Sequence, residues 1–309
     1  MRLTRRAFTL VELVVATALA GLVGALITGT LVRQQRFHAA ASEMLDVRAQ
    51  LRDAADVLAT DIRGAAVATF GLPVMTDSAI EMYATIATSV ACAAPAGATI
   101  GLPPASLASG NTLTSVLAQP DTGDLAMLYG IPSGVPDSGR WETARVTAFT
   151  SRAVTTACPA STGFTTAADA AASGYVVTLA TAPSIAVRTG APIHFLRRVR
   201  YSLYRSSDGM WYLGYRRCNV AGPPACAVIQ PVSGPYSAYS GSSGASGLSF
   251  RYYDSSGAEL SAGISSTAVA RVDIVMRGQT ARATALTGDA RTAYRDSAVI
   301  TVSPRNRTR

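Results

Sequence analysis

The feature that most constrains this chain is an apolar run close to its N-terminus. Between Phe8 and Val32 the only charged residue is Glu12. The part from Leu13 to Val32 alone is about 20 residues long, roughly 30 Å as a helix, which matches the hydrocarbon thickness of a bilayer. We therefore predict a retained membrane anchor, because a cleaved signal peptide has a shorter apolar core. The arginines before the run, which would hold the N-terminus in the cytoplasm, are Arg2, Arg5 and Arg6.

The helical period continues beyond the apolar run. Apolar residues recur every three or four positions on one face, and the charged residues fall off that face, as in an amphipathic helix. No proline occurs before Pro73. We expect one helix from Phe8 to about Ala66, spanning a membrane over residues 8–32 and packing on a folded domain over residues 33–66. The stripe consists of Phe37, Ala40, Met44, Val47, Leu51, Ala54, Leu58, Ile62 and Ala65.

Glu12 is the residue that does not fit a simple anchor. A carboxylate near the centre of a spanning helix costs roughly 2.5–3.5 kcal/mol, and less towards the helix ends. Such a charge in an apolar bundle requires a cationic partner. A simple membrane-boundary residue next to Arg6 is the alternative interpretation.

The string Arg6-Ala-Phe-Thr-Leu-Val-Glu-Leu13 resembles the processing site of type IV prepilins and of the pseudopilins of type II secretion. The resemblance implies a leader at residues 1–7, cleavage between Ala7 and Phe8, and N-methylation of Phe8. It also implies that Glu12 pairs with the Phe8 amine of a neighbouring subunit and so sets the register of assembly. Ala7 departs from the family, which has Gly at this position.

The remainder of the chain has the pattern of strands. Asp208-Gly209 is a hairpin signal between two of them. We predict an α+β fold, in which a mainly antiparallel sheet over residues 67–303 packs on the amphipathic half of the helix. Three segments rich in small residues, 92–122, 158–174 and 234–247, are interpreted as surface insertions, and residues 304–309 as a frayed tail. The predicted strands are Ile80–Ile86, Leu125–Gly130, Trp141–Thr150, Tyr175–Ala182, Ile193–Tyr204, Met210–Arg216, Leu248–Tyr253, Val269–Arg277 and Ala298–Val302.

The order of these elements resembles the minor pilin W and minor pseudopilin J group within the same family. The segments that carry this likeness are the hairpin at 198–217, the stretch 247–260 and the last strand with its Arg-Asn end. At 309 residues the chain is large for a major pilin. The resemblance therefore implies a minor subunit close to the filament tip.

Four cysteines suggest disulfides in an exported domain. Cys218 and Cys226 flank a Gly-Pro-Pro turn, so we favour a local bridge between them and a second bridge between Cys92 and Cys158. The sequence by itself permits three pairings. No C-x-x-C pair is present, and the chain has two histidines, so we predict no metal site.

We predict neither an enzyme nor a cofactor. Hydrolase, metalloprotease and phosphate-loop motifs are missing from the sequence, and His194 is interpreted as a structural strand residue. Acidic residues near glycine turns lack the EF-hand spacing, so we interpret them as solvated turn residues rather than a Ca²⁺ site. They are Asp121, Asp124, Asp254 and Glu259. The net charge of +8 is dispersed, which does not support nucleic-acid binding.

These features predict a minor pilin or pseudopilin that initiates or caps a type IV pilus or a type II secretion pseudopilus. Its partners would be other pilin or pseudopilin subunits, the prepilin peptidase/methyltransferase and the inner membrane. The chain would cross that membrane once, with its N-terminus cytoplasmic and its sheet domain periplasmic, before it enters the filament. The alternative is an envelope binding module that is anchored in the membrane and never polymerises.

Overall fold

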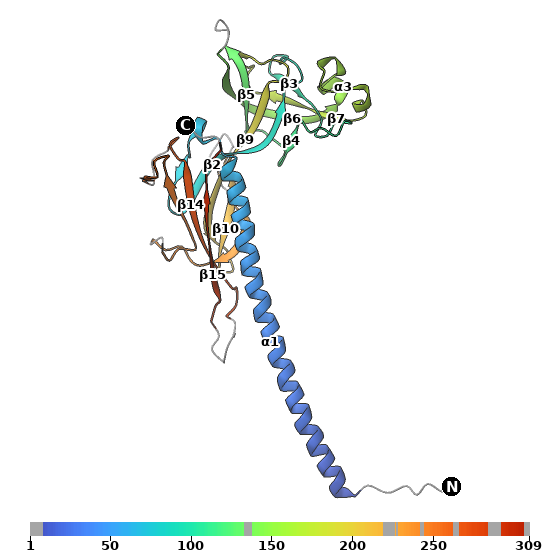
Figure 1. The fold of residues 1–309 in the computed structure, drawn as a ribbon, viewed down its shortest axis with the longest axis vertical. Coiled ribbons are helices and arrows are strands. Elements are labelled where there is room, and N and C mark those ends of the chain that lie inside the picture. The colour runs from blue at the N-terminus through green and yellow to red at the C-terminus, as the bar shows by residue number, and fades with distance from the viewer. Residues whose placement is uncertain are drawn as a thin grey trace, which may run out of the picture.

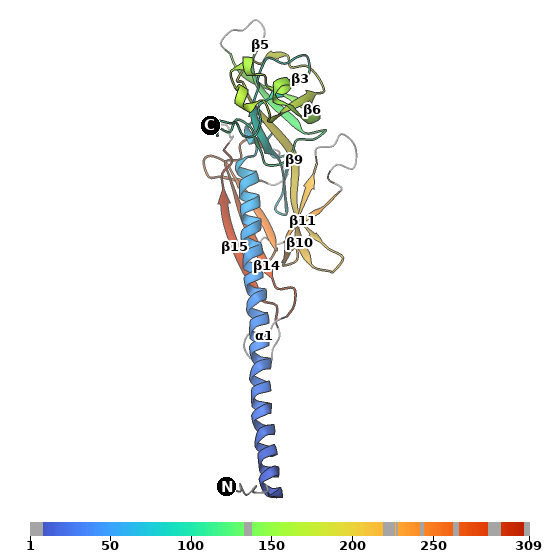
Figure 2. The ribbon, with the colours of Figure 1, turned by 90° about the vertical axis from the view of Figure 1, so that its right-hand side faces the viewer.

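The computed structural model describes residues 9–132, 138–218, 226, 228–241, 244–261, 266–283 and 292–305. One long helix forms the axis of the molecule (Figure 1). Its N-terminal half projects alone, and its C-terminal half lies against a sheet. A second group of strands stands beyond the C-terminal end of the helix, as both views show (Figure 2).

Helix α1 runs from Leu10 to Arg63 without a break. It ends three residues earlier than the apolar stripe predicted, because the backbone of residues 64–66 bonds to a strand instead. The amide of Thr85 donates to the carbonyl of Gly64 at 3.3 Å, and the amide of Ala66 donates to the carbonyl of Tyr83 at 3.0 Å. The chain then forms a single helical turn, α2, at Val67–Phe70.

All strand pairs in the described residues are antiparallel, and together with α1 they confirm the predicted α+β fold. Each predicted strand corresponds to a longer strand of the sheet or to one of similar length. The strands are β1 (Val74–Met75), β2 (Ala79–Val90), β3 (Thr99–Leu102), β4 (Ser115–Val116), β5 (Leu125–Pro132), β6 (Arg140–Ala153), β7 (Ser173–Leu179), β8 (Ile185–Ala186), β9 (Pro192–Arg205), β10 (Trp211–Arg217), β11 (Gln230–Tyr236), β12 (Leu248–Tyr253), β13 (Glu259–Leu260), β14 (Arg271–Gln279) and β15 (Arg295–Val302). The short helix α3 covers Val154–Ala157.

The strands form two lobes. The proximal lobe contains β10–β15 and packs on residues 40–63 of α1; the distal lobe contains β3–β8 and α3. Strands β2 and β9 are paired over almost their whole length, from Ala79 opposite Ser202 to Val90 opposite Pro192, and they belong to both lobes. A bulge between Thr85 and Ala87 interrupts this pairing where one lobe passes into the other.

The proximal core forms between α1 and the sheet. Leu51, Leu58 and Ile62 of the helix are buried against alternate residues of the strands, which is how a helix stripe meets one face of a sheet. The approach is close at Gly278 of β14, where an added Cβ atom would lie 2.9 Å from Cγ1 of Val47. Glycine is therefore required at this position for α1 to pack at its observed depth.

The distal core receives no residue from α1. It is made from the curled strands β5, β6, β7 and β3, with Phe149 and Phe195 in edge-to-face contact at 5.6 Å. Ile193 and Phe195 of β9 face this core, and Val199 and Tyr201 of the same strand face the proximal core. One face of β9 thus supplies both lobes.

A buried ion pair lies between the two cores. Arg197 of β9 donates from Nη2 to Oδ2 of Asp124 at 2.7 Å and from Nε to Oδ1 at 3.1 Å. The Asp124 side chain is fully buried and that of Arg197 is 7% exposed. Arg197 also donates to the carbonyl of Gln119 at 2.8 Å. The pair joins β9 to the turn before β5 and so fixes the lobes to each other.

The interpretation of three segments as surface insertions is wrong in part. Segment 92–122 contains β3 and β4, and its Ile100 and Leu102 are buried in the distal core. Segment 158–174 contains the buried Asp169, and segment 234–247 contains the buried Tyr236. Of the predicted tail, residues 306–309 lie outside the described residues, and the amide of Arg305 donates to the carbonyl of Arg63 at 3.1 Å.

Candidate assembly helix

The first turn of α1 contains the residue that the sequence analysis singled out. Glu12 and Thr9 form a reciprocal capping box. The Thr9 side chain accepts from the amide of Glu12 at 3.3 Å, and Oε2 of Glu12 accepts from the amide and the hydroxyl of Thr9, both at 3.0 Å. The carboxylate therefore points back along the chain to Thr9. Ala7 and Phe8 themselves lie outside the described residues.

Thr9 is the functional neighbour that the sequence analysis missed. The signal was present, since Thr-x-x-Glu before an apolar run is a capping-box pattern. As a result, the Glu12 carboxylate has two donors within its own chain and is partly satisfied there. A cation on a neighbour would add to these bonds rather than be the first partner of the carboxylate.

The N-terminal half of α1 is apolar, and within the described part of the chain its side chains are not buried against the sheet. Its side chains are exposed over the whole run, from Leu10 at 79% to Leu31 at 51%, and Ala40 is the first buried residue. This half is long and apolar enough to cross a membrane; a signal sequence near an N-terminus satisfies the same criterion. Its exposed side chains would face lipid or other helices.

Polar groups in this half are satisfied within the helix. The hydroxyls of Thr17, Thr28 and Thr30 donate to backbone carbonyls three or four residues earlier, at 2.8 to 3.0 Å. Such bonds remove the cost of an unpaired hydroxyl in hydrocarbon. Gly21 and Gly24 have open space around them, with no atom within 4 Å of an added Cβ. A second helix could therefore approach closely here.

The C-terminal half of α1 is fixed to the sheet by a buried hydrogen bond. The hydroxyl of Tyr201 on β9 donates to Oδ2 of Asp61 at 2.6 Å. Burial raises the pKa of Asp61 above its ordinary range, and the Tyr201 bond opposes that rise. Burial, followed by the charge of Asp61, also raises the pKa of Tyr201. The neutral phenol is thus held as the donor.

Contacts closer to the N-terminal half of α1 orient the helix further. Nε of Arg48 donates to Oδ2 of Asp296 on β15 at 3.0 Å. Oε1 of Gln50 accepts from the amide of Gly234 at 2.8 Å. Because these contacts are spread along the helix, the direction in which its free half projects is set by the domain.

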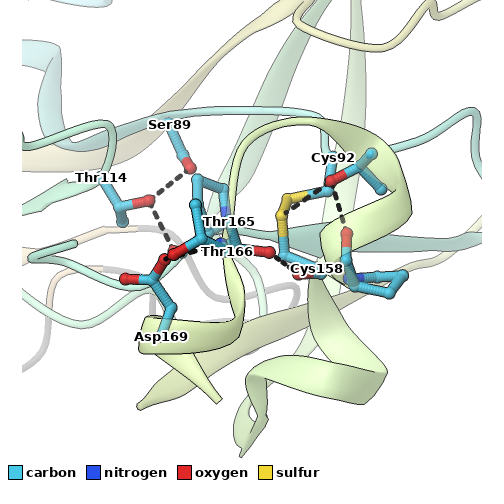
Figure 3. The surroundings of a disulfide bond; sticks show 10 residues. Ser89, Cys92, Thr114, Cys158, Thr165, Thr166 and Asp169 are labelled. Atoms are coloured by element: carbon cyan, nitrogen blue, oxygen red, sulfur yellow. Dashed lines mark hydrogen bonds between the residues drawn. A yellow bond between two sulfur atoms is a disulfide. The ribbon is translucent and has the colours of Figure 1, made fainter. Parts of the chain in front are cut away.

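The structure joins Cys92 to Cys158 in the distal lobe. Hydrogen bonds surround this disulfide, as the side chains in Figure 3 show. Thr165 donates to the carbonyl of Cys158 at 2.7 Å, and Asp169 accepts from the amide of Thr166 at 2.7 Å. Asp169 also accepts from the amide of Ala108 at 2.6 Å, and these backbone bonds lower its pKa. The bridge therefore joins the segment that follows β2 to the C-terminal end of α3 and to this hydrogen-bond network.

Cys218, which directly follows the C-terminal end of β10, is joined to Cys226. These are the two pairs that the sequence analysis favoured, and disulfides are typical of an extracytoplasmic domain. Glu81 lies beside the second bridge and could form a metal-ligand group with the two sulfurs. Both sulfurs are in the bridge, and the carboxylate forms an ion pair with Arg198, so this group does not offer three free ligands.

Three of the four turn carboxylates have protein partners in the structure, and the interpretation of Asp124 as a solvated turn residue is wrong because its side chain is fully buried. Asp124 binds Arg197, and Oδ2 of Asp121 lies 3.4 Å from Nη2 of Arg217. Asp254 accepts from the amides of Ser256 and Ala258 within its own turn. His194 packs edge-on against Trp141 at 5.1 Å, and burial lowers its pKa. That burial fits the structural role predicted for His194.

The overall architecture, a long N-terminal apolar helix packed on an antiparallel sheet, is pilin-like in shape. No family model, curated protein or solved structure matches the chain.

Proposed function

We propose that this chain is a minor pilin or pseudopilin, a structural subunit that initiates or caps a type IV pilus or a type II secretion pseudopilus. The observation that carries the proposal is the division of α1. One unbroken helix has a C-terminal half built into a folded domain and an N-terminal half whose apolar surface is entirely unused by that domain. Such a surface is a means of burying one subunit against others once it leaves the lipid.

Glu12 would set the axial offset between the apolar helix halves of neighbouring subunits. In a bundle of parallel helices, a neighbour's cationic amine would add a charged partner to a carboxylate that already accepts two bonds from Thr9. A subunit at the wrong offset would leave the charges unpaired in an apolar environment, which is costly. Cleavage between Ala7 and Phe8 would supply the amine.

The distal lobe supports a terminal position. It stands beyond the C-terminal end of α1 and extends over the side of the helix that the sheet leaves uncovered (Figures 1 and 2). Helices of neighbouring subunits would pack on that uncovered side. A subunit added above would meet the distal lobe, whereas one added below would not, so the shape favours a place at the filament end.

The test is incorporation of Glu12 variants into filaments in the host's own assembly system. We expect Glu12→Ala and Glu12→Gln to be processed and inserted in the membrane, yet absent from sheared filaments. Thr9→Val is the matched control, because it removes the intrachain hydroxyl bond and keeps the charge, so it should still be incorporated. Mass spectrometry of the mature N-terminus should give methylated Phe8.

Two results would overturn the proposal. A chain that still begins at Met1 would exclude prepilin processing. Normal incorporation of Glu12→Ala would exclude the register role. A wild-type chain that never leaves the membrane fraction, under conditions where filaments form, would favour the anchored binding module.

A further inference from the structure

We propose that Arg200 and Arg216, on the face of the sheet opposite α1, form a binding site for a phosphate-type oxyanion. The two residues are direct cross-strand partners in the β9–β10 pair. Val199, Tyr201 and Leu213, which alternate with them along the same strands, face the proximal core. Since successive side chains point to opposite faces, the two guanidinium groups lie on the outer face.

This arrangement is unfavourable in the absence of a ligand. Directly opposed side chains have Cβ atoms about 4.5–5.5 Å apart, and like charges at that separation destabilise a sheet. Both residues are half-buried. Burial, followed by the charge of Arg200, lowers the pKa of Arg216. The pair is thus a concentration of positive charge that water screens incompletely.

The Nε atoms of the pair need an acceptor. Within the part of the chain that the structure describes, Nε of Arg200 and Nε of Arg216 are both shielded from solvent and have no hydrogen-bond partner. A buried donor without an acceptor costs about 1–3 kcal/mol, and more when it is charged. An anion bound on the outer face would draw the two half-buried guanidinium groups towards it, and both Nε donors could then reach an acceptor.

The nearest carboxylate does not serve this purpose. Glu81 lies opposite Arg200 in the β2–β9 pair, but its side chain is 2% exposed and its Oε1 forms an ion pair with Arg198. Glu81 is thus already engaged by Arg198. The planar, forked donors of two arginines match the oxygens of a phosphate group better than a single charge could.

The position of the site limits the source of the phosphate. Arg200 precedes Tyr201, which bonds Asp61 of α1, and Asp61 is roughly 40 Å along the helix from Val32. Lipid headgroups at the end of the membrane span are therefore out of reach. A small pocket of about 110 Å³ lined by Arg145, Arg198 and Tyr83 extends the same face towards the distal lobe. The ligand is thus a phosphate group in solution, either free or esterified.

The experiment is a titration of the full-length protein in detergent with inorganic phosphate at constant ionic strength. Thermal unfolding and calorimetry are followed for the wild type, Arg200→Gln, Arg216→Gln and the control Arg152→Gln, an exposed arginine of β6. We expect phosphate to raise the melting temperature of the wild type and the control. In both site variants the affinity should fall at least about tenfold.

A second readout separates binding from a structural role. Without phosphate, the site variants should melt no lower than the wild type, because each removes a like-charge contact. A phosphodiester oligonucleotide in place of inorganic phosphate distinguishes the two sources: competition by it shows that an esterified phosphate is accepted, and its failure to compete restricts the site to free phosphate.

Three results would overturn the proposal: no response of the wild type, an equal response in Arg216→Gln, or a lower melting temperature of the variants without phosphate. The site is independent of the proposed assembly role, so these outcomes leave that role untouched.

Discussion

The two lobes reach a stable core by different means. The proximal lobe packs a sheet on residues 40–63 of α1, so a single helix supplies one side of its core. The core of the distal lobe is built from strands, including the parts of β2 and β9 that it shares with the proximal lobe, and a disulfide joins Cys92 to Cys158 beside it. Where the helix ends, a covalent link and a hydrogen-bond network take over its role in closing the core.

The two lobes also have different structural roles. The proximal lobe must hold α1 in a fixed direction, which the Asp61–Tyr201 bond and the packing of Leu58 provide. The distal lobe needs no contact with the apolar half of the helix. Its surface residues can therefore make other contacts, as long as its core residues and its disulfide are kept.

The largest expected effect comes from opening the distal disulfide. Cys92→Ser with Cys158→Ser releases a loop of sequence separation 66, and the loop-entropy relation gives a loss of about 4 kcal/mol in unfolding free energy. The matched double variant, Cys218→Ser with Cys226→Ser, opens a loop of sequence separation 8. The same relation gives it a loss of about 2.5 kcal/mol in unfolding free energy. Urea unfolding in detergent measures both. If opening the Cys218–Cys226 bridge lowered the unfolding free energy more than opening the Cys92–Cys158 bridge, the distal lobe would not depend on its disulfide as described.

The next effect tests the helix-based core. Leu58→Ala removes a side chain with 0% exposure and should lower the unfolding free energy by about 3 kcal/mol. Leu22→Ala, at 60% exposure in the free half of the same helix, should leave the unfolding free energy unchanged. Thermal unfolding of the two variants under one detergent condition compares them. Equal losses would mean that both halves of α1 support the domain.

A smaller effect is expected for Tyr201→Phe. The substitution keeps the ring and removes the donor to Asp61, which leaves a largely buried carboxyl group with one bond fewer. The expected loss is about 1–2 kcal/mol. Tyr204→Phe, three residues along the same strand, is the control and should be neutral. A neutral Tyr201→Phe would show that packing alone fixes α1.

The smallest effect is a pH dependence of the proximal lobe. The folded pKa of Asp61 is raised above its ordinary value of 3.8, so the folded state binds this proton more tightly than the unfolded state. Unfolding free energy should therefore fall as pH rises from about 4 through the raised pKa. The difference between wild type and Asp61→Asn isolates this group. If the unfolding free energy of the wild type rose over this pH range relative to that of Asp61→Asn, the prediction would be wrong.

The sequence predicted the helix and the long strands well, because these depend on local periodicity. The stripe from Phe37 to Ala65 and the alternation in 269–277 are visible without any partner. The end of α1 was missed by three residues, since Gly64 and Ala66 bond to β2 across a distance that no local pattern records.

The division into lobes could not be predicted in the same way. Strand β3 lies in a segment of small residues and prolines, and its burial depends on pairing with β7 far along the chain. Likewise Asp124 appeared as a turn residue, because its partner Arg197 is distant in sequence. Contacts of this kind follow from topology rather than from composition. Thr9 differs: its role beside Glu12 had a local signature.

Strands β2 and β9 run through both lobes, and this continuity has a mechanical consequence. If α1 is held in a filament and the distal lobe is pulled, the tension passes along these two strands. Because both strands are continuous across the junction, their two covalent backbones carry this load side by side, and the hydrogen bonds between them keep the strands together. The lobes would resist separation under traction far better than a flexible linker, and the weakest point would be the bulge beside Thr85.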